Sequence, residues 1–104
     1  MILIIVVLVT LKARVGDTQV GHGCFPPTNA IVGSSNVFVN GRPAMNVGGQ
    51  YAPHCCPKNG CHPVVQASGS GTVRINGKPA ARLGDKCGCG GSVITGSGNV
   101  FTGG

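Results

Sequence analysis

Along most of the chain, hydrophobic and polar residues alternate in short runs that end at glycine, asparagine or serine. The first eleven residues, MILIIVVLVTL, differ because they carry no charge and are dominated by isoleucine and valine. Further on, the alternating residues 36–39 and 72–75 each lead into an Asn-Gly pair. That pair is a strong signal for a two-residue β-hairpin turn, in which both central residues need positive φ. The pattern predicts short antiparallel strands and an all-β fold.

The same segment recurs at a fixed spacing. Residues 33–49 (GSSNVFVNGRPAMNVGG) align without a gap with residues 69–85 (GSGTVRINGKPAARLGD), at an offset of 36. A third copy begins at Gly96 as GSGNVFTGG, and ARVGD at residues 13–17 matches the end of the second copy. The repeats predict one small domain of three β-hairpins, arranged cyclically, that starts and finishes in mid-repeat.

Composition leaves little material for a conventional core. The 104 residues include 19 glycines and 7 prolines but no tryptophan, and only 10% are charged, against about a quarter in an ordinary soluble domain. The low charge argues against a charge-rich disordered tail, and the glycines keep no three-residue collagen period. The absence of glutamate and the scarcity of leucine argue against a helical bundle. A β protein of this kind needs a further source of stability.

Six cysteines permit either a disulfide framework or metal binding. The three histidines each lie beside a cysteine or a glycine-rich turn, in the segments GHGC, HCC and CH. A disulfide scaffold has no need of that association, so a metal site is favoured. A secreted, disulfide-stapled or zinc-stabilised binding module stays open as the alternative.

The repeats place three metal-capable side chains at nearly equivalent points. His22 and His54 each follow a repeat glycine by six residues, and Cys89 follows its own by five. Around a pseudo-threefold axis these three would converge, and His62 in a Pro/Gly-rich segment can add a fourth ligand. This set suits one structural Zn²⁺. Cys87 is the alternative to Cys89, and the other four cysteines could be buried thiols, disulfides or a rival zinc cluster in HCCPKNGCH.

No catalytic constellation is apparent, and we expect a protein that is not an enzyme. There is no glutamate, and the two aspartates, Asp17 and Asp85, follow equivalent repeat glycines, which marks a turn instead of an acid–base pair. A zinc ion with four protein ligands also leaves no position for substrate. The formal net charge of +6 comes from scattered cations without aromatic platforms, so nucleic-acid binding is not expected.

The segment PAARLGD at residues 79–85 resembles the motif that names the PAAR-repeat family. The segment ARVGD followed by His22, the GS-x-x-V-x-x-NG-x-P-A units and the closing CGG-x-x-x-x-GS-x-NV also fit that family. The first full unit departs from it, with PAMN in place of PAAR and Gly48-Gly49 in place of Gly-Asp. We therefore expect an apolar N-terminal strand or extension over residues 1–11 and a PAAR-repeat domain over residues 12–104.

This resemblance implies a small cone of hairpins with zinc near its apex, bound by three histidines and one cysteine. Its base would cap the trimeric β-helical spike of a contractile injection machine (a type VI secretion system, a contractile phage tail or a related particle), with one tip per trimer. Such a tip sharpens the spike for membrane puncture and touches the target membrane transiently. It is assembled in the bacterial cytoplasm and then ejected or carried on the particle. Extended members carry effectors, for which this chain has no room, so a bare tip is expected; effectors are a further class of partner.

The N-terminal run is too short to cross a bilayer, which takes about twenty residues. It also lacks the leading positive charge and the cleavage site of a signal peptide. Its isoleucines and valines suit a strand at an interface. We expect residues 1–11 to lie at or near the base, where strand edges would be covered by the spike.

Overall fold

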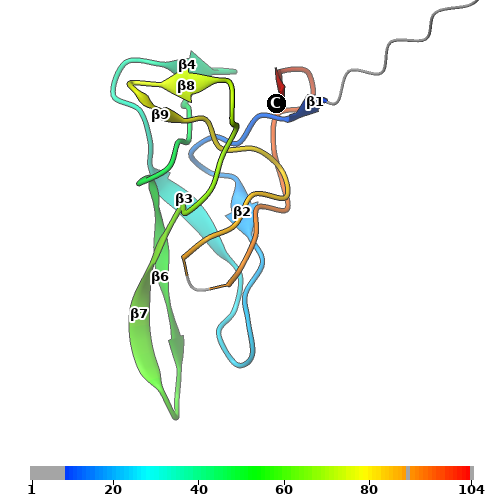
Figure 1. Cartoon of the computed structure of the whole chain (residues 1–104). Helices are drawn as coiled ribbons and strands as arrows, with labels where there is room; N and C mark the ends of the chain where they lie inside the picture. The colour runs from blue at the N-terminus through cyan, green and yellow to red at the C-terminus, as the bar shows by residue number, and fades with distance from the viewer. Residues whose placement is uncertain (1–8, 89, 104) are drawn as a thin grey trace, which may run out of the picture.

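The computed structural model describes residues 9–88 and 90–103 and contains no helix in that part. Ten short strands there form four antiparallel sheets (Figure 1). The two-stranded sheets pair β4 (Phe38–Val39) with β5 (Arg42–Pro43), β8 (Arg74–Ile75) with β9 (Lys78–Pro79), and β1 (Val9–Leu11) with β10 (Phe101–Gly103). The four-stranded sheet has the order β2 (Thr18–Gln19), β3 (Thr28–Val32), β6 (Gln50–Cys56), β7 (Gly60–Val65). The predicted all-β class is confirmed.

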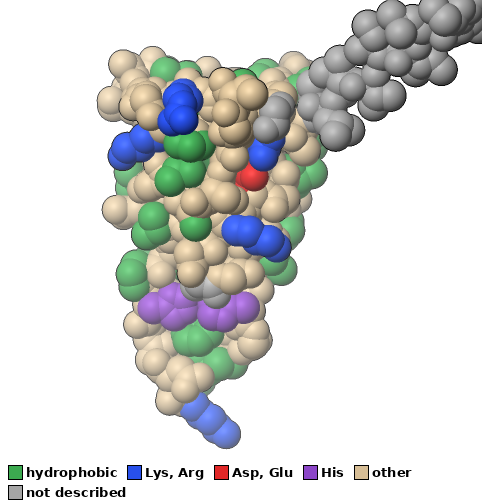
Figure 2. Space-filling model, in the orientation of Figure 1, with side chains coloured by type: hydrophobic (Ala, Val, Ile, Leu, Met, Phe, Trp, Pro, Cys, Tyr) green, Lys and Arg blue, Asp and Glu red, His purple; other side chains and the backbone are tan. Residues whose placement is uncertain are grey.

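The described part of the chain tapers from a broad end to a narrow end. The three two-stranded sheets lie at the broad end, and the β6–β7 hairpin runs down to the tip (Figure 1). The space-filling view shows the same cone, with the histidine side chains in one band near the narrow end (Figure 2). No helix among residues 9–88 and 90–103 has the length and apolar character needed to cross a membrane.

Two of the hairpins form as the Asn-Gly pairs predict. Asn40 and Gly41 have φ of 54° and 76° between β4 and β5, and Asn76 and Gly77 have 53° and 79° between β8 and β9. Positive φ at both central residues is what a type I′ turn requires, and asparagine and glycine adopt it at little cost. The turn chemistry therefore sets these two hairpins locally.

The third hairpin is assembled from the two ends of the described chain. β1 pairs with β10 so that Leu11 faces Phe101 and Thr10 faces Thr102. This register matches that of the second hairpin, where Arg74 faces Pro79. The cyclic arrangement predicted from the repeats is thereby confirmed. Residues 9–11 of the N-terminal run thus lie at the broad end. The expectation that residues 1–11 lie at or near the base is not tested for residues 1–8, which fall outside the described residues.

A ring of backbone hydrogen bonds marks the pseudo-threefold axis. The N–H of Ala13 donates to the carbonyl of Ala81, Ala81 donates to Met45, and Met45 donates to Ala13, over 3.0–3.1 Å. All three side chains are fully buried. Two of the three ring residues are alanine, whose small side chains let the backbones approach closely, and the third is Met45, whose longer side chain is buried as well.

Lys12 caps this ring from one side. Its Nζ donates to the carbonyls of Ala13, Met45 and Ala81 over 2.9, 2.6 and 2.7 Å, and the residue is only 3% exposed. The equivalent positions of the other two repeats hold alanine. Burial lowers the pKa of Lys12 to about 8, although Asp85 and Asp17 act to raise it.

Two disulfides cross-link the narrow half of the cone: Cys24 is bonded to Cys56, and Cys55 to Cys61. The rival zinc cluster in HCCPKNGCH is therefore wrong, because its three cysteines are oxidised to disulfides and cannot act as thiolate ligands. The structure also corrects the choice between a metal site and disulfides. A disulfide framework is present beside the clustered histidines, so the two are not exclusive.

Candidate metal centre

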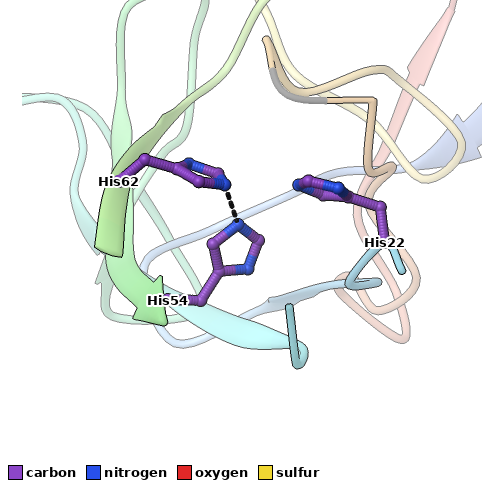
Figure 3. Close-up of side chains that lie close together, drawn as sticks. All are labelled: His22, His54 and His62. Atoms are coloured by element: carbon purple, nitrogen blue, oxygen red, sulfur yellow. Dashed lines mark hydrogen bonds between the residues drawn. The ribbon is translucent and has the colours of Figure 1, made fainter. Parts of the chain in front are cut away.

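Three histidines from distant parts of the chain meet near the narrow end. His22 lies in the loop between β2 and β3, while His54 on β6 and His62 on β7 are direct partners across the antiparallel ladder. Side chains on facing positions of neighbouring strands project to the same side, which brings these two imidazoles together. One ring nitrogen of each histidine lies within 4.8 Å of the others (Figure 3). The cluster could therefore hold a metal ion.

Backbone carbonyls orient two of the rings. The Nδ1 of His54 lies 2.8 Å from the carbonyl oxygen of Pro26, and the Nδ1 of His62 lies 2.9 Å from that of Pro63. Because a carbonyl can only accept, each Nδ1 carries the hydrogen, and in the neutral ring each Nε2 is left with a lone pair. This is the arrangement by which proteins present a histidine nitrogen to a metal.

The remaining nitrogens face one another. The Nε2 atoms of His54 and His62 are 2.9 Å apart, and the Nε2 of His22 is buried without a hydrogen-bond partner. Figure 3 shows the three rings directed at a common space. Lone pairs crowded in this way repel unless a cation lies between them, and a buried polar atom without a partner costs free energy. The donor set therefore fits a metal ion.

The electrostatics of His22 favour the same state. Desolvation of its ring, together with the neighbouring His54 and His62, lowers the pKa of His22 below its ordinary value. A neutral imidazole is the form that coordinates a metal. Protonation of His22 would place a positive charge beside two further imidazoles.

Phe25 is a member of this site that the sequence analysis missed. Its ring centroid lies 5.0 Å from that of His22, 4.9 Å from that of His54 and 4.4 Å from that of His62. The aromatic ring thus packs against all three imidazoles. The available signal was its position three residues after His22, in the segment GHGCF.

The two disulfides connect all three histidine-bearing segments. Cys24, two residues after His22, is bonded to Cys56 on β6. The second disulfide joins the residue after His54 to the residue before His62, across β6 and β7. The three ligand segments are thus held covalently in one unit.

The two candidates for the cysteine ligand, Cys89 and Cys87, have different outcomes. Cys89 lies outside the described residues, so its role stays a prediction. Cys87 is described; it is 3% exposed, forms no disulfide and packs in the core cluster with Tyr51 and Val93. It is not among the described side chains that group with the histidines.

Sequence comparison places this architecture among known proteins. A family model described as the PAAR motif matches residues 20–95. The chain belongs to the PAAR motif family. The matched segment contains His22, His54 and His62 as well as Cys89.

Two curated relatives from Pseudomonas aeruginosa share this domain. The chain is 47% identical over 85 residues to the NAD(P)(+) glycohydrolase toxin Tse6 of strain PAO1, and 47% identical over 85 residues to the (p)ppApp synthetase toxin Tas1 of strain UCBPP-PA14. Each match covers 76% of this chain but only 20% and 19% of the respective toxin. The chain thus spans about a fifth of the length of these relatives.

Proposed function

We propose that this PAAR domain is a non-enzymatic structural tip that caps the trimeric β-helical spike of a contractile injection machine. One Zn²⁺ near the apex, held by His22, His54, His62 and Cys89, stabilises the cone. The observation that carries the proposal is the convergence of three imidazole Nε2 atoms in a domain with a small core. Four protein ligands close a tetrahedral site, which supplies cross-linking and leaves no open position for substrate.

A metal ion bound at this cluster would cross-link the segments that form the narrow end of the cone. The three histidines come from the β2–β3 loop, from β6 and from β7, which together form most of the narrow end. Binding a structural zinc stabilises small domains by on the order of 10 kcal/mol. A tip that is pushed through a membrane must not unfold, and few large side chains are present to pack it.

The broad end has features suited to docking. Phe38 on β4 is 58% exposed and Phe101 on β10 is 53% exposed, and they occupy equivalent positions of two hairpins. Exposed aromatic side chains beside short strand edges are typical of a surface that a partner covers. A partner with true threefold symmetry would meet three similar hairpins, which accounts for one tip per trimer.

The relatives suggest how the tip is used. Both are toxins by name, and the part that matches this chain is about a fifth of each. We propose that the domain serves a type VI secretion system, in which effectors travel on or with the tip; a contractile phage tail or related particle would use the same cone. It would be assembled in the bacterial cytoplasm and touch the target membrane only transiently, during puncture.

Metal analysis of single variants tests the zinc site. We expect about one zinc per chain in the wild type, and loss of zinc from H22A, H54A, H62A and C89S. The matched control is C87S, which removes a buried thiol outside the histidine cluster and should keep its zinc. The zinc content per chain is measured by mass spectrometry after gel filtration, and circular dichroism verifies that each variant folds.

The outcomes separate the proposal from its alternative. A wild type without zinc, stable through its two disulfides alone, would support the disulfide-stapled binding module. Zinc lost from C87S but retained by C89S would overturn the assignment of the fourth ligand while leaving the three histidines in place.

A further inference from the structure

The flanks of the cone differ between the three repeats. In two of them an arginine and an aspartate three residues later form an ion pair: Arg14 Nε lies 2.9 Å from Asp17, and Arg82 Nε lies 3.0 Å from Asp85. The backbone N–H of each arginine also donates to the same carboxylate, over 2.8 and 2.7 Å. In the remaining repeat the equivalent residues are Asn46 and Gly49.

The replacement of aspartate by Gly49 removes the carboxylate, whereas the backbone N–H that would donate to it is still present, on Asn46. The N–H of Asn46, at the position equivalent to those of Arg14 and Arg82, has no hydrogen-bond partner among the described residues. Asn46 is 9% exposed, and its side chain donates elsewhere, to the carbonyl of Ile75. A backbone donor without a partner among the described residues is thus left where the sister repeats bind a carboxylate.

A pocket of about 380 Å³ opens at the same place, lined by Asn46, Gly49, Gly33, Asn76 and Lys78 among others. In the sister repeats the arginine side chain fills the equivalent space. Arg82 reaches the carbonyl of Gly69 over 3.5 Å, and Arg14 reaches the side chain of Asn40 over 3.1 Å. Gly33 and Asn76, which line the pocket, are the counterparts of Gly69 and Asn40.

The pocket has a cation but no anion. Lys78 is exposed at its rim, with Nζ 3.4 Å from the place where a Cβ on Gly48 would stand. The chain has only two acidic side chains, and Asp17 and Asp85 are both bound to their own arginines. No side-chain carboxylate of this chain is left for Lys78.

In this repeat the end of the Met45 side chain occupies part of the space that a side chain at position 49 would need. A Cβ on Gly49 would come within 2.8 Å of the Cε of Met45, whereas the counterparts of Met45 in the other repeats are alanines. Met45 therefore occupies the space next to the backbone, and the outer pocket stays open to the surface.

We propose that this pocket binds a carboxylate group from outside the domain, contacted by the ammonium of Lys78 and the N–H of Asn46. The two sister repeats bind a carboxylate with the equivalent N–H, which defines the chemistry of the ligand. The source is either a small free carboxylate or the side chain of an aspartate or glutamate of another protein. The pocket shares no residue with the proposed zinc ligands or with Phe38 and Phe101.

Acetate titration of the ¹⁵N-labelled chain, at constant ionic strength maintained with NaCl, tests the site by NMR. We expect saturable shifts of the amide signals of Asn46 and Gly49, and none of those of Arg14 and Arg82, whose carboxylates are built in. K78M should weaken acetate binding at least fivefold. The matched control is K86M, which removes an exposed lysine away from the pocket and should bind acetate as the wild type does.

A second variant fills the pocket from within. The triple substitution M45A/N46R/G49D recreates the ion pair of the sister repeats and should abolish the acetate response while the fold is kept. Parallel titration with N-acetyl-aspartate N-methylamide distinguishes the sources. If this blocked residue binds at least as tightly as acetate, the site accepts a protein side chain; if only acetate binds, it accepts free carboxylates. No saturable shift, or equal shifts in wild type and K78M, would overturn the proposal.

Discussion

Lys12 shows how one residue breaks the symmetry of the repeats. Its ammonium lies where three carbonyls converge on the pseudo-threefold axis, and each carbonyl also accepts a backbone hydrogen bond from the ring. Lysine is almost never fully buried unless it is paired. Three carbonyl acceptors match the three hydrogens of an ammonium, and burial still lowers its pKa to about 8.

Stability should therefore depend on pH through Lys12. The pKa of Lys12 is lower in the folded state, at about 8, than the ordinary lysine value of 10.5, so above pH 8 the unfolded chain binds the proton more tightly. The pH-dependent contribution of Lys12 to the free energy of unfolding is therefore complete above pH 10.5, decreases as the pH falls and is lost as the pH passes through 8. Relative to K12M, the wild type should gain about 2 kcal/mol of unfolding free energy between pH 7 and pH 9.5. Urea denaturation at both pH values measures this.

The K86M variant is the control for that comparison, because it removes an exposed lysine and should keep a constant offset from the wild type. A difference between wild type and K12M that does not change with pH would show that Lys12 has an ordinary pKa in the folded state.

At the scale of elements, the β6–β7 hairpin and the β2–β3 loop build the apex together. His54 and His62 are held opposite each other by the strand ladder as well as by the Cys55–Cys61 disulfide. The loop that carries His22 has weaker support, a local bridge to Phe25 and the Cys24–Cys56 disulfide. The two disulfides therefore differ in what they contribute.

Removal of the long-range disulfide should cost more. Cys24–Cys56 closes 32 residues and Cys55–Cys61 closes 6, so loop-closure entropy predicts losses of about 4 and about 2 kcal/mol for C24S/C56S and C55S/C61S. C24S/C56S should also lose more zinc affinity, because it releases the His22 segment. Denaturation and competition with a chelator measure the two effects. A larger loss in C55S/C61S, by either measure, would contradict this ranking.

At the scale of the whole molecule, closure of the ring sets the broad end. β1 and β10 complete the third hairpin, so three hairpins surround the axis and present Phe38 and Phe101 outward. Ile31 on β3 is as exposed as Phe101, at 53%, but it lies on the flank of the cone and not on a hairpin of the broad end.

Charge on the broad end should prevent docking. F38D/F101D should weaken binding to the cognate trimeric spike by at least tenfold, because each aspartate would be buried against the partner. I31D should bind as the wild type does. Biolayer interferometry with immobilised spike trimer measures the affinity, and melting curves verify the fold. Equal binding by wild type and F38D/F101D would show that this face is not the docking surface.

The sequence by itself determined the features that depend on local geometry. The two Asn-Gly turns need only the conformational freedom of two adjacent residues, and the offset of 36 revealed the hairpin repeat. His22 and His54 were predictable as candidate ligands because they occupy repeat-equivalent positions that converge around a common axis, whereas His62 was a candidate only from its Pro/Gly-rich segment. Residue type and spacing carried that information without any knowledge of packing.

Only the tertiary structure decided what depends on residues far apart in the chain. The pairing of the four apex cysteines, the burial of Lys12 and the place of Phe25 among the imidazoles all arise when the ring closes. The replacement of Arg-Asp by Asn46 and Gly49 was visible as a departure from the repeat, but not the pocket that it opens. The pattern of residue types predicts which side of a strand is buried. The distances between segments that are far apart in the chain depend on how the whole cone packs.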